Sequence, residues 1–447
     1  MLRTIDLRGR SLTASELLDT VPRATAALEE AQHAAAQIVA AVASDGEAAL
    51  RDQAERFDGV AGHDIRVPQQ HLDEALEGLD PIVRAALEEA IVRVRAASAA
   101  QVPPPATTDL DAGARVIQRW QPVRRVGLYV PGGKAVYPSS VVMNVVPAQV
   151  AGVDEVALAS PPQREFGGRI HPVILAAARL LGVTEVYAMG GAGAIGAFAH
   201  GVPSLGLERV DVVTGPGNNF VAAAKRVVAG LVGTDAEAGA TEILIVADDS
   251  ADPRLVSADL VSQAEHDEQA SAVLVTASAA LADAVAADIV ERASRTRHAE
   301  RVRTALSGPQ SAIVLVDDLA AATAFSNAYA PEHLELHLEA PRPEDFIHAG
   351  AVFVGPHAPV SLGDYLAGSN HVLPTGGQAR YASGLSASTF LRPQQVIEYD
   401  RAALARVSAA IVALAEAEAL PAHGEAITAR FDGHAPSSGA TAAAVGA

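Results

Sequence analysis

The chain has 447 residues, a formal net charge of −20 at pH 7 and no cysteine, and this length suits roughly two to four domains. The acidic charge argues against a nucleic-acid partner, and the missing thiols exclude disulfides, thiolate metal sites and a catalytic thiol. Because no apolar run is long enough to span a bilayer and the first residues lack the core of a signal peptide, we expect a cytoplasmic protein that does not bind membranes.

The first elements along the chain are expected to be helical. Residues 26–57 and 81–99 are rich in Ala, Leu and Glu, a composition that favours helices. Asp80 is a suitable N-cap for the second helix, and Pro81 suits its first position because the amide hydrogen that proline lacks is not needed there. The sequence therefore predicts two long helices before any strand.

From about residue 125 the pattern changes to short β-branched runs separated by helical segments. This alternation is typical of βα units around a parallel sheet. The runs form two series and so predict an α/β protein with two sheets: 126–130, 156–159, 186–189 and 210–213 in the first series, and 243–246, 272–275, 313–316 and 352–354 in the second.

The C-terminal part is expected to form a separate piece. Residues 375–388 are rich in Gly and Ser and predict a linker, and residues 401–420 predict a helix beyond it. Residues 435–447 are small and weakly apolar, so we expect them to be disordered.

Glycine-rich turns give a signal with two interpretations. Residues 191–196 match GxGxxG between a predicted strand and a predicted helix, and Asp211 follows about 20 residues later, where a dinucleotide-binding fold carries a ribose-binding carboxylate. In a chain this rich in Gly and Ala, a turn that packs a helix closely against a strand is an equally good interpretation. Residues 129–133 and 215–219 form turns at predicted strand ends, where α/β proteins bind ligands, although ordinary tight turns are the alternative.

Two polar clusters are candidates for chemistry. Gln263 and His266 lie three residues apart, so on a helix they would share a face and aim an amide oxygen and an imidazole at one point. Glu332 and His333 follow Pro331, which marks an element boundary. A metal site and a catalytic pair fit these clusters, and solvated helix residues and a structural Glu-His pair are the alternatives.

An ordered set of segments resembles the histidinol dehydrogenase family over almost the whole chain. The segments are Tyr-Val-Pro-Gly-Gly at 129–133, Gly-Pro-Gly-Asn at 215–218, Ser-Gln-Ala-Glu-His at 262–266, Ala-Pro-Glu-His-Leu at 330–334 and Gly-Asp-Tyr-Leu-Ala-Gly-Ser-Asn-His-Val-Leu-Pro at 363–374. The resemblance implies zinc-dependent, NAD-linked oxidation of L-histidinol to L-histidine through the aldehyde, the last step of histidine biosynthesis.

The same resemblance implies a role for each matching site residue. One zinc ion per subunit is expected to be bound by Gln263, His266, Asp364 and His423, a cysteine-free set that leaves room for substrate. His333 is expected to serve as the base in both oxidations. Because no thiol can capture the aldehyde, Glu332 is expected to activate water for the second oxidation. The implied substrate contacts are these six residues together with Thr241, His371 and Glu418.

The resemblance implies a cofactor site and a homodimer as well. Tyr129 and Asn218 match positions that touch NAD, and Gly193 stands where the family usually has Gln, so its effect on NAD binding is open. The C-terminal piece, with Glu418 and His423, is expected to cross to the partner subunit, so that each site would need two chains.

The expected domain organisation combines two large, discontinuous domains with two small ones. We expect an N-terminal helical segment at 1–25 and two related, incomplete Rossmann-like domains, the first formed by 26–125 with 242–320. The second, with the cofactor site, would comprise 126–241 with 321–376. A C-terminal domain at 377–447 would reach the partner subunit.

Other classes of function remain open at this point. A zinc-dependent hydrolase could use the same side chains with metal-activated water, and it would not reduce NAD. A catalytically weakened binding homologue would be consistent with Gly193, although the intact Glu332-His333 pair argues against it. A Rossmann dehydrogenase for another alcohol would use the GxGxxG run and would need no metal.

Overall fold

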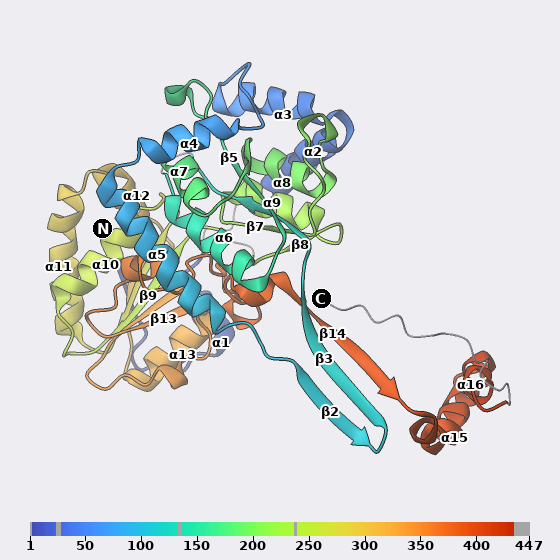
Figure 1. Ribbon diagram of the computed structural model, residues 1–447. Coiled ribbons are helices and arrows are strands. Elements are labelled where there is room, and N and C mark those ends of the chain that lie inside the picture. Colours follow the sequence, from blue (N-terminus) through green and yellow to red (C-terminus); the bar gives the residue numbers. More distant parts are fainter. Residues whose placement is uncertain (1, 24–27, 133–135, 237–238, 433–447) are drawn as a thin grey trace. The chain divides into compact units, whose positions relative to one another are not determined.

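The computed structural model describes residues 2–23, 28–132, 136–236 and 239–432 (Figure 1). The chain divides into two compact units, one formed by residues 1–102 and 122–391 and the other by residues 103–121 and 392–447. The expected disorder of residues 435–447 lies outside the described residues. Among the residues described, no helix combines the length and the apolar character that crossing a bilayer requires.

A six-stranded parallel sheet forms one half of the first unit. Its order is β1-β11-β10-β9-β12-β13, and every neighbouring pair is parallel. One face packs against α10, α11 and α12, and α13 with α1 covers the other. The elements are β1 Arg3–Asp6, α1 Ala14–Leu18, β9 Glu242–Ala247, α10 Pro253–Ala264, β10 Ser271–Thr276, α11 Ala279–Arg295, α12 Ala299–Ser307, β11 Ala312–Leu315, α13 Leu319–Tyr329, β12 His333–His337 and β13 Ala351–Val354.

A five-stranded parallel sheet forms the other half. Its order is β6-β5-β4-β7-β8. Helices α8, α9 and α2 pack against one another and against one face of this sheet. Two outer helices pack against the helices α6 and α7: α5 contacts α6, and α4 contacts α7. The elements are α2 Leu28–Asp45, α4 Gln69–Glu77, α5 Pro81–Ala99, β4 Arg125–Tyr129, α6 Pro138–Ala151, β5 Glu155–Ser160, α7 Pro172–Leu180, β6 Glu185–Ala188, α8 Gly191–His200, β7 Val212–Thr214, α9 Asn219–Val228 and β8 Gly233–Thr234.

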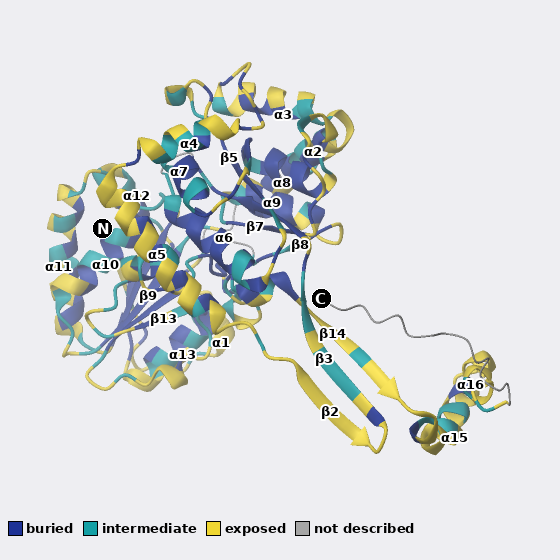
Figure 2. Cartoon of the chain, in the orientation of Figure 1, coloured by how far each residue is buried: buried dark blue, intermediate teal, exposed yellow. Residues whose placement is uncertain are grey.

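Both sheets have the same topology. Counted along the chain from β4 or from β9, the strand order is 3-2-1-4-5 in each sheet, and β1 is added outside β11. This order is that of a Rossmann half with its crevice between the first and fourth strands. The expected α/β fold with two parallel-rich sheets is therefore confirmed, and each β-branched run of the sequence overlaps a strand. The inner strands of both sheets are buried, whereas the edge strands β1, β8 and β13 are partly exposed (Figure 2).

The helix predictions succeeded where a local signal was present. Helix α5 begins at Pro81 and is capped by Asp80, whose carboxylate accepts hydrogen bonds from the amides of Ile82 and Val83. The expected helix at 26–57 is instead broken at Gly46, whose φ of 54° lies in the left-handed region. The chain continues from there as α3 (Glu47–Gln53) and a π-helical turn at Ala54–Asp58.

The strand pairing differs from the expected division into domains. Residues 1–25 are not only helical, because β1 pairs with β11 at the edge of the six-stranded sheet. Strand β12 pairs with β9, and β13 pairs with β12, so the strands of 321–376 belong with 242–320 and not with 126–241. Helices α2, α4 and α5 of 26–125 pack beside the five-stranded sheet. Hydrophobic periodicity identifies a buried face but does not identify the sheet that covers it.

The second unit contains a three-stranded sheet and two helices. The sheet has the order β14-β3-β2 and comprises β2 Ala106–Asp111, β3 Ala114–Pro122 and β14 Leu391–Tyr399. Helix α15 (Arg401–Ala417) agrees with the helix expected at 401–420, and it packs against α16 (Pro421–Thr428). The β2–β3 hairpin was not expected, because β2 is exposed along its whole length and has no apolar face (Figure 2). The C-terminal unit thus begins at 392 instead of 377 and includes residues 103–121.

Candidate active site

The two expected catalytic residues lie where β12 begins, beside the beginning of β9. Helix α13 ends at Ala330, a C-cap with φ of 52°, and Pro331 then prevents the helix from continuing. Strand β12 follows, with His333 opposite Ile243 in the parallel register. Glu332 and His333 are 6% and 4% exposed. The site is therefore built on the amino ends of two central strands.

The peptide groups and side chains at the start of β9 hold this pair. The Glu332 carboxylate accepts hydrogen bonds from the Thr241 hydroxyl at 2.6 Å and from the Glu242 amide at 2.8 Å. Burial raises the pKa of Glu332, while the electrostatic interaction with His333 and these two donors oppose the rise. Nδ1 of His333 lies 3.0 Å from the Glu242 carbonyl oxygen. Because a carbonyl oxygen can only accept a hydrogen bond, Nδ1 carries the ring hydrogen in this contact. Nε2 is therefore the ring nitrogen that can accept a proton.

Thr241 also fixes the orientation of Gln263. The Thr241 hydroxyl has one hydrogen, which it donates to Glu332, so it must accept the bond from the Gln263 side-chain amide at 2.6 Å. Gln263 is 1% exposed, and its Oε1 is buried without a hydrogen-bond partner among the described residues. A buried amide oxygen without a donor is costly unless something else satisfies it, and a cation would do so.

His266 and Asp364 have the chemistry of further ligands for that cation. Their Nε2 and Oδ2 atoms are 3.9 Å apart, and Nδ1 of His266 lies 3.2 Å from the Ser262 carbonyl oxygen, which leaves Nε2 free. Gln263 and His266 lie at the carboxyl end of α10, where the helix dipole favours positive charge. Amide, imidazole and carboxylate together suit zinc, so the residues present fit a bound metal.

Asp364 is held in place by close packing of its helix, α14 (Val360–Tyr365). A Cβ on Gly363 would lie 2.6 Å from the Phe353 ring, so only glycine allows α14 to approach β13 this closely. His371 lies beside the same helix, with Nδ1 2.9 Å from the Asp364 carbonyl oxygen and Nε2 3.0 Å from the Ser140 hydroxyl. Burial lowers the pKa of His371, and the charge on Asp364 opposes this. The first unit thus brings His371 next to Asp364 and Ser140.

Glu418 and His423 belong to the second unit. Glu418 is the C-cap residue of α15, and His423 lies in α16. Their contribution to the site therefore stays a prediction.

A second carboxylate-imidazole group lies further along β12. Ligand atoms of Asp259, Glu335 and His337 all lie within 4.8 Å of one another, the composition of a metal-binding group. Glu335 already bonds Nε2 of His337 at 3.2 Å and accepts from the Val360 amide at 2.8 Å. Burial, followed by the charge on Glu335, raises the pKa of Asp259 to about 7. Sequence reasoning missed this group, although alternate residues of a strand share a face.

Two of the expected cofactor residues, Tyr129 and Asn218, follow the carboxyl ends of β4 and β7, the switch point of the five-stranded sheet, and the third, Gly193, lies in α8 after β6. The Tyr129 hydroxyl accepts from the Gly191 amide at 3.1 Å, and burial raises the pKa of Tyr129 to about 12. Asn218 caps α9 through its side-chain oxygen. Gly215, between them, has φ of 119°, and a Cβ there would lie 1.9 Å from the Tyr129 carbonyl oxygen.

The GxGxxG run packs helices together. It lies inside α8, where a Cβ on Gly196 would lie 3.2 Å from Cα of Val39 in α2, and one on Gly193 would lie 1.8 Å from the Gln53 side chain. The geometry supports close packing, but of helix α8 against other helices and not of a helix against a strand as expected. Asp211 is not placed to bind ribose, because its carboxylate accepts from the Arg124 and Arg125 amides at the amino end of the sheet.

Comparison with known proteins identifies the family of the chain. A family model described as histidinol dehydrogenase matches residues 21–431. Histidinol dehydrogenase from Leifsonia xyli subsp. xyli (strain CTCB07) is 64% identical over 433 residues, which are 96% of this chain and 99% of that protein. Histidinol dehydrogenase from Mycobacterium tuberculosis (strain ATCC 25618 / H37Rv) is 57% identical over 437 residues, 97% of this chain and 98% of that one. A crystal structure of histidinol dehydrogenase from Elizabethkingia anophelis matches with a TM-score of 0.89 at 31% identity, covering 96% of this chain and 98% of its own. The chain therefore belongs to the histidinol dehydrogenase family of oxidoreductases.

Proposed function

We propose that this chain is an L-histidinol dehydrogenase, which oxidises L-histidinol to L-histidine in two NAD-linked steps through the aldehyde and uses one zinc ion per subunit. The family membership supports the substrate. The observation that carries the proposal is the fixed arrangement of Glu332 and His333 beside the unpartnered amide oxygen of Gln263. This arrangement supplies two proton acceptors next to a cation site.

Gln263, His266 and Asp364 would hold the zinc ion, with His423 of the partner subunit as the fourth ligand. Bound zinc would act mainly as a template that holds the imidazole and amino nitrogens of the substrate. The carboxylate of Glu418 would pair with the substrate ammonium, and Thr241 and His371 would line the same site. We further propose a homodimer in which Glu418 and His423 reach the site of the partner subunit.

His333 would take the proton in each oxidation. Its Nδ1 is engaged by the Glu242 carbonyl, so Nε2 accepts the hydroxyl proton of the alcohol and later that of the hydrated aldehyde. NAD would supply the hydride acceptor each time. Tyr129 and Asn218 would bind it at the switch point, and Gly193 would contribute from α8. Two hydrides and two hydroxyl protons leave as the alcohol becomes the carboxylic acid, and a third proton leaves when the acid ionises to the carboxylate of L-histidine.

Glu332 would act between the two oxidations. As a carboxylate it can take a proton from water as the water adds to the aldehyde, while His333 returns the proton it took in the first oxidation to the aldehyde oxygen. This hydration replaces the covalent capture that a thiol would provide. Thr241 and the Glu242 amide stabilise its charged form against the effect of burial. Glu332→Gln should therefore allow the first oxidation and block the second, whereas His333→Asn should slow both by about 10² to 10⁴.

The test is the number of NADH molecules formed per L-histidinol consumed, with and without a chelator. We expect a ratio of two for the wild type, a ratio near one for Glu332→Gln, and no turnover after the metal is removed until zinc is added back. A hydrolase would consume its substrate without forming NADH. A dehydrogenase for another alcohol would keep its activity in chelator, and either outcome would contradict the proposal.

A further inference from the structure

A single residue, Glu242, holds both catalytic side chains through its backbone. Its amide donates to the Glu332 carboxylate at 2.8 Å, and its carbonyl oxygen lies 3.0 Å from Nδ1 of His333. Any shift at the beginning of β9 would therefore move the base and the water-activating carboxylate together.

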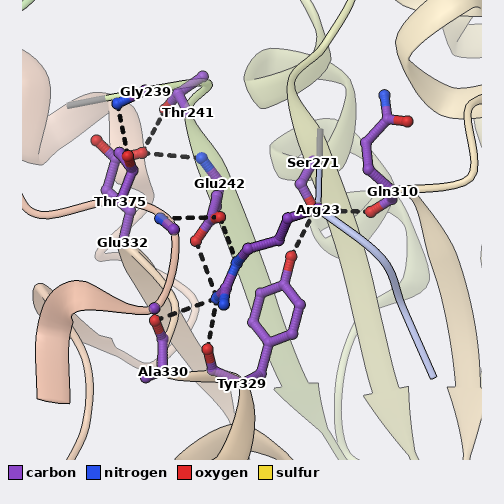
Figure 3. Close-up of polar contacts among 12 residues, drawn as sticks. Arg23, Gly239, Thr241, Glu242, Ser271, Gln310, Tyr329, Ala330, Glu332 and Thr375 are labelled. Carbon is purple, nitrogen blue, oxygen red and sulfur yellow. Dashed lines mark hydrogen bonds and ion pairs between the residues drawn. The ribbon is translucent and has the colours of Figure 1, made fainter. Parts of the chain in front are cut away.

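The side chain of Glu242 is in turn held by Arg23, from the segment before the first long helix. Nε and Nη2 of Arg23 donate to the two carboxylate oxygens of Glu242 at 2.6 and 3.3 Å. The two side chains are 14% and 4% exposed. Figure 3 shows the Arg23 guanidinium between Glu242 and Tyr329. A planar guanidinium that binds a carboxylate through two nitrogens fixes its orientation as well as its distance.

Arg23 also holds the segment that leads into β12. Its guanidinium donates to the carbonyl oxygens of Tyr329 and Ala330, and its Cζ lies 4.0 Å from the centre of the Tyr329 ring. Ala330 is the left-handed residue from which the chain turns into Pro331 and Glu332. Arg23 thus ties the beginning of β9 to the beginning of β12, the two places from which the catalytic groups are presented.

We propose that Arg23 is a positioning residue for the reaction, which acts through Glu242 to aim Glu332 and His333. The inference rests on the proposed function and assigns a task to a residue that touches neither substrate nor cofactor. Burial raises the pKa of Glu242, and the charge and hydrogen bonds of Arg23 oppose that rise. Without Arg23, this carboxylate would keep only the Gly376 amide at 3.2 Å, and it would take up a proton or leave its place, so that the peptide group at 242 would be held less firmly.

The experiment compares Arg23→Lys with Arg125→Lys in the full-length enzyme. Arg125 is a matched control, because it is also a buried arginine bound to carboxylates, those of Glu155 and Glu185, but it lies in the five-stranded sheet. Lysine keeps the charge and loses the two-nitrogen geometry. We expect Arg23→Lys to lower kcat about 10- to 100-fold, the effect of a misplacement of about 1 Å, with KM and zinc content within about twofold of wild type. Arg125→Lys should lower the unfolding midpoint and leave kcat within about twofold.

The product ratio separates this inference from a general loss of structure. Because Glu332 and His333 would move together, Arg23→Lys should still form two NADH per L-histidinol, only more slowly. A kcat equal to that of wild type, or equal losses in the two arginine variants, would overturn the inference. If Arg23→Lys does not fold, Glu242→Gln tests the same inference, and we expect it to lower kcat and leave KM unchanged. A wild type that forms no NADH from L-histidinol would instead overturn the proposed function.

Discussion

At the scale of single residues, the hydroxyl of Thr241 determines the direction of two hydrogen bonds. It donates to Glu332 and accepts from Gln263, and both donor-acceptor distances are 2.6 Å. The Gln263 amide therefore cannot rotate by half a turn without losing its bond, because Thr241 has no second hydrogen to offer. One small side chain thus links the expected metal ligand to the expected water-activating carboxylate.

Thr241→Val should reduce activity and metal binding together. Valine has nearly the same shape but neither donates to Glu332 nor accepts from Gln263, and loss of a hydrogen bond to a charged group costs about 1.5–3 kcal/mol. We expect kcat to fall about 10- to 100-fold and zinc to be lost at a lower chelator concentration. Thr241→Ser keeps the hydroxyl and is the control. Wild-type kcat and zinc retention in Thr241→Val would show that the hydroxyl has no such role.

At the scale of elements, the approach of α8 to α2 depends on a glycine. A Cβ on Gly196 would lie 3.2 Å from the backbone Cα of Val39, and a backbone atom cannot move aside as a flexible side chain can. The two helices share the apolar core on one face of the five-stranded sheet. The GxGxxG spacing therefore records helix packing in this chain.

Gly196→Ala should destabilise the protein despite the better helix propensity of alanine. The added methyl group must push α8 and α2 apart, and overpacking of this kind typically costs about 1–3 kcal/mol. Gly424→Ala in α16 is the matched control, because its Cβ would meet Val412 at an ordinary distance of 3.5 Å or more. Urea unfolding midpoints should fall for Gly196→Ala and stay level or rise for Gly424→Ala. Equal midpoints in the two variants would contradict the packing argument.

The individual elements could largely be predicted from the sequence, whereas their partners could not. Apolar runs such as 243–246 identify strands because a parallel strand covered on both faces is apolar throughout. Asp80 identifies a helix start because a carboxylate accepts from free amides there. Strand β1 contains Arg3 and Asp6 in four residues, so it gives no apolar pattern, and only its pairing with β11 defines it.

The same distinction applies to the site. Gln263, His266 and the Glu332-His333 pair could be selected because residue type and spacing carry the chemistry. Arg23 and Glu242 could not, because their importance comes from contacts between segments more than 200 residues apart in sequence. A sequence motif identifies the side chains that react, whereas the side chains that hold them in place are identified only from the contacts in the structure.

At the scale of the whole molecule, several carboxyl groups are buried among other charges. Burial raises the pKa of Asp235, Glu242 and Glu332, and it raises that of Asp259 from 3.8 to about 7. A raised carboxyl pKa means that folding takes up a proton. The stability that such a group contributes is present below the pKa of the unfolded chain and is lost as the pH rises through the pKa of the folded one.

Asp259 should therefore make the protein less stable as the pH rises from about 4 to 7. The neighbouring charges are Glu335 and His337 on β12 and Arg292 on α11, and the pKa difference is equivalent to at most about 1.4 kcal/mol per pH unit. Asp259→Asn should flatten the dependence of the urea midpoint on pH between 5 and 7. Asp283→Asn, at an exposed position of α11, is the control. Parallel curves for Asp259→Asn and wild type would remove Asp259 as the cause.

The hydrogen bond between Arg23 and Tyr329 has a consequence for how the chain folds while it is being synthesised. The two residues are 306 positions apart, so a ribosome must complete most of the polypeptide before the arginine can find its carbonyl acceptors. Strand β1 likewise waits for β11. Contacts of such long range slow folding and leave early segments exposed in the meantime. We therefore expect the catalytic geometry to form late in translation, after the segments that contain Arg23 and Tyr329 have come into contact.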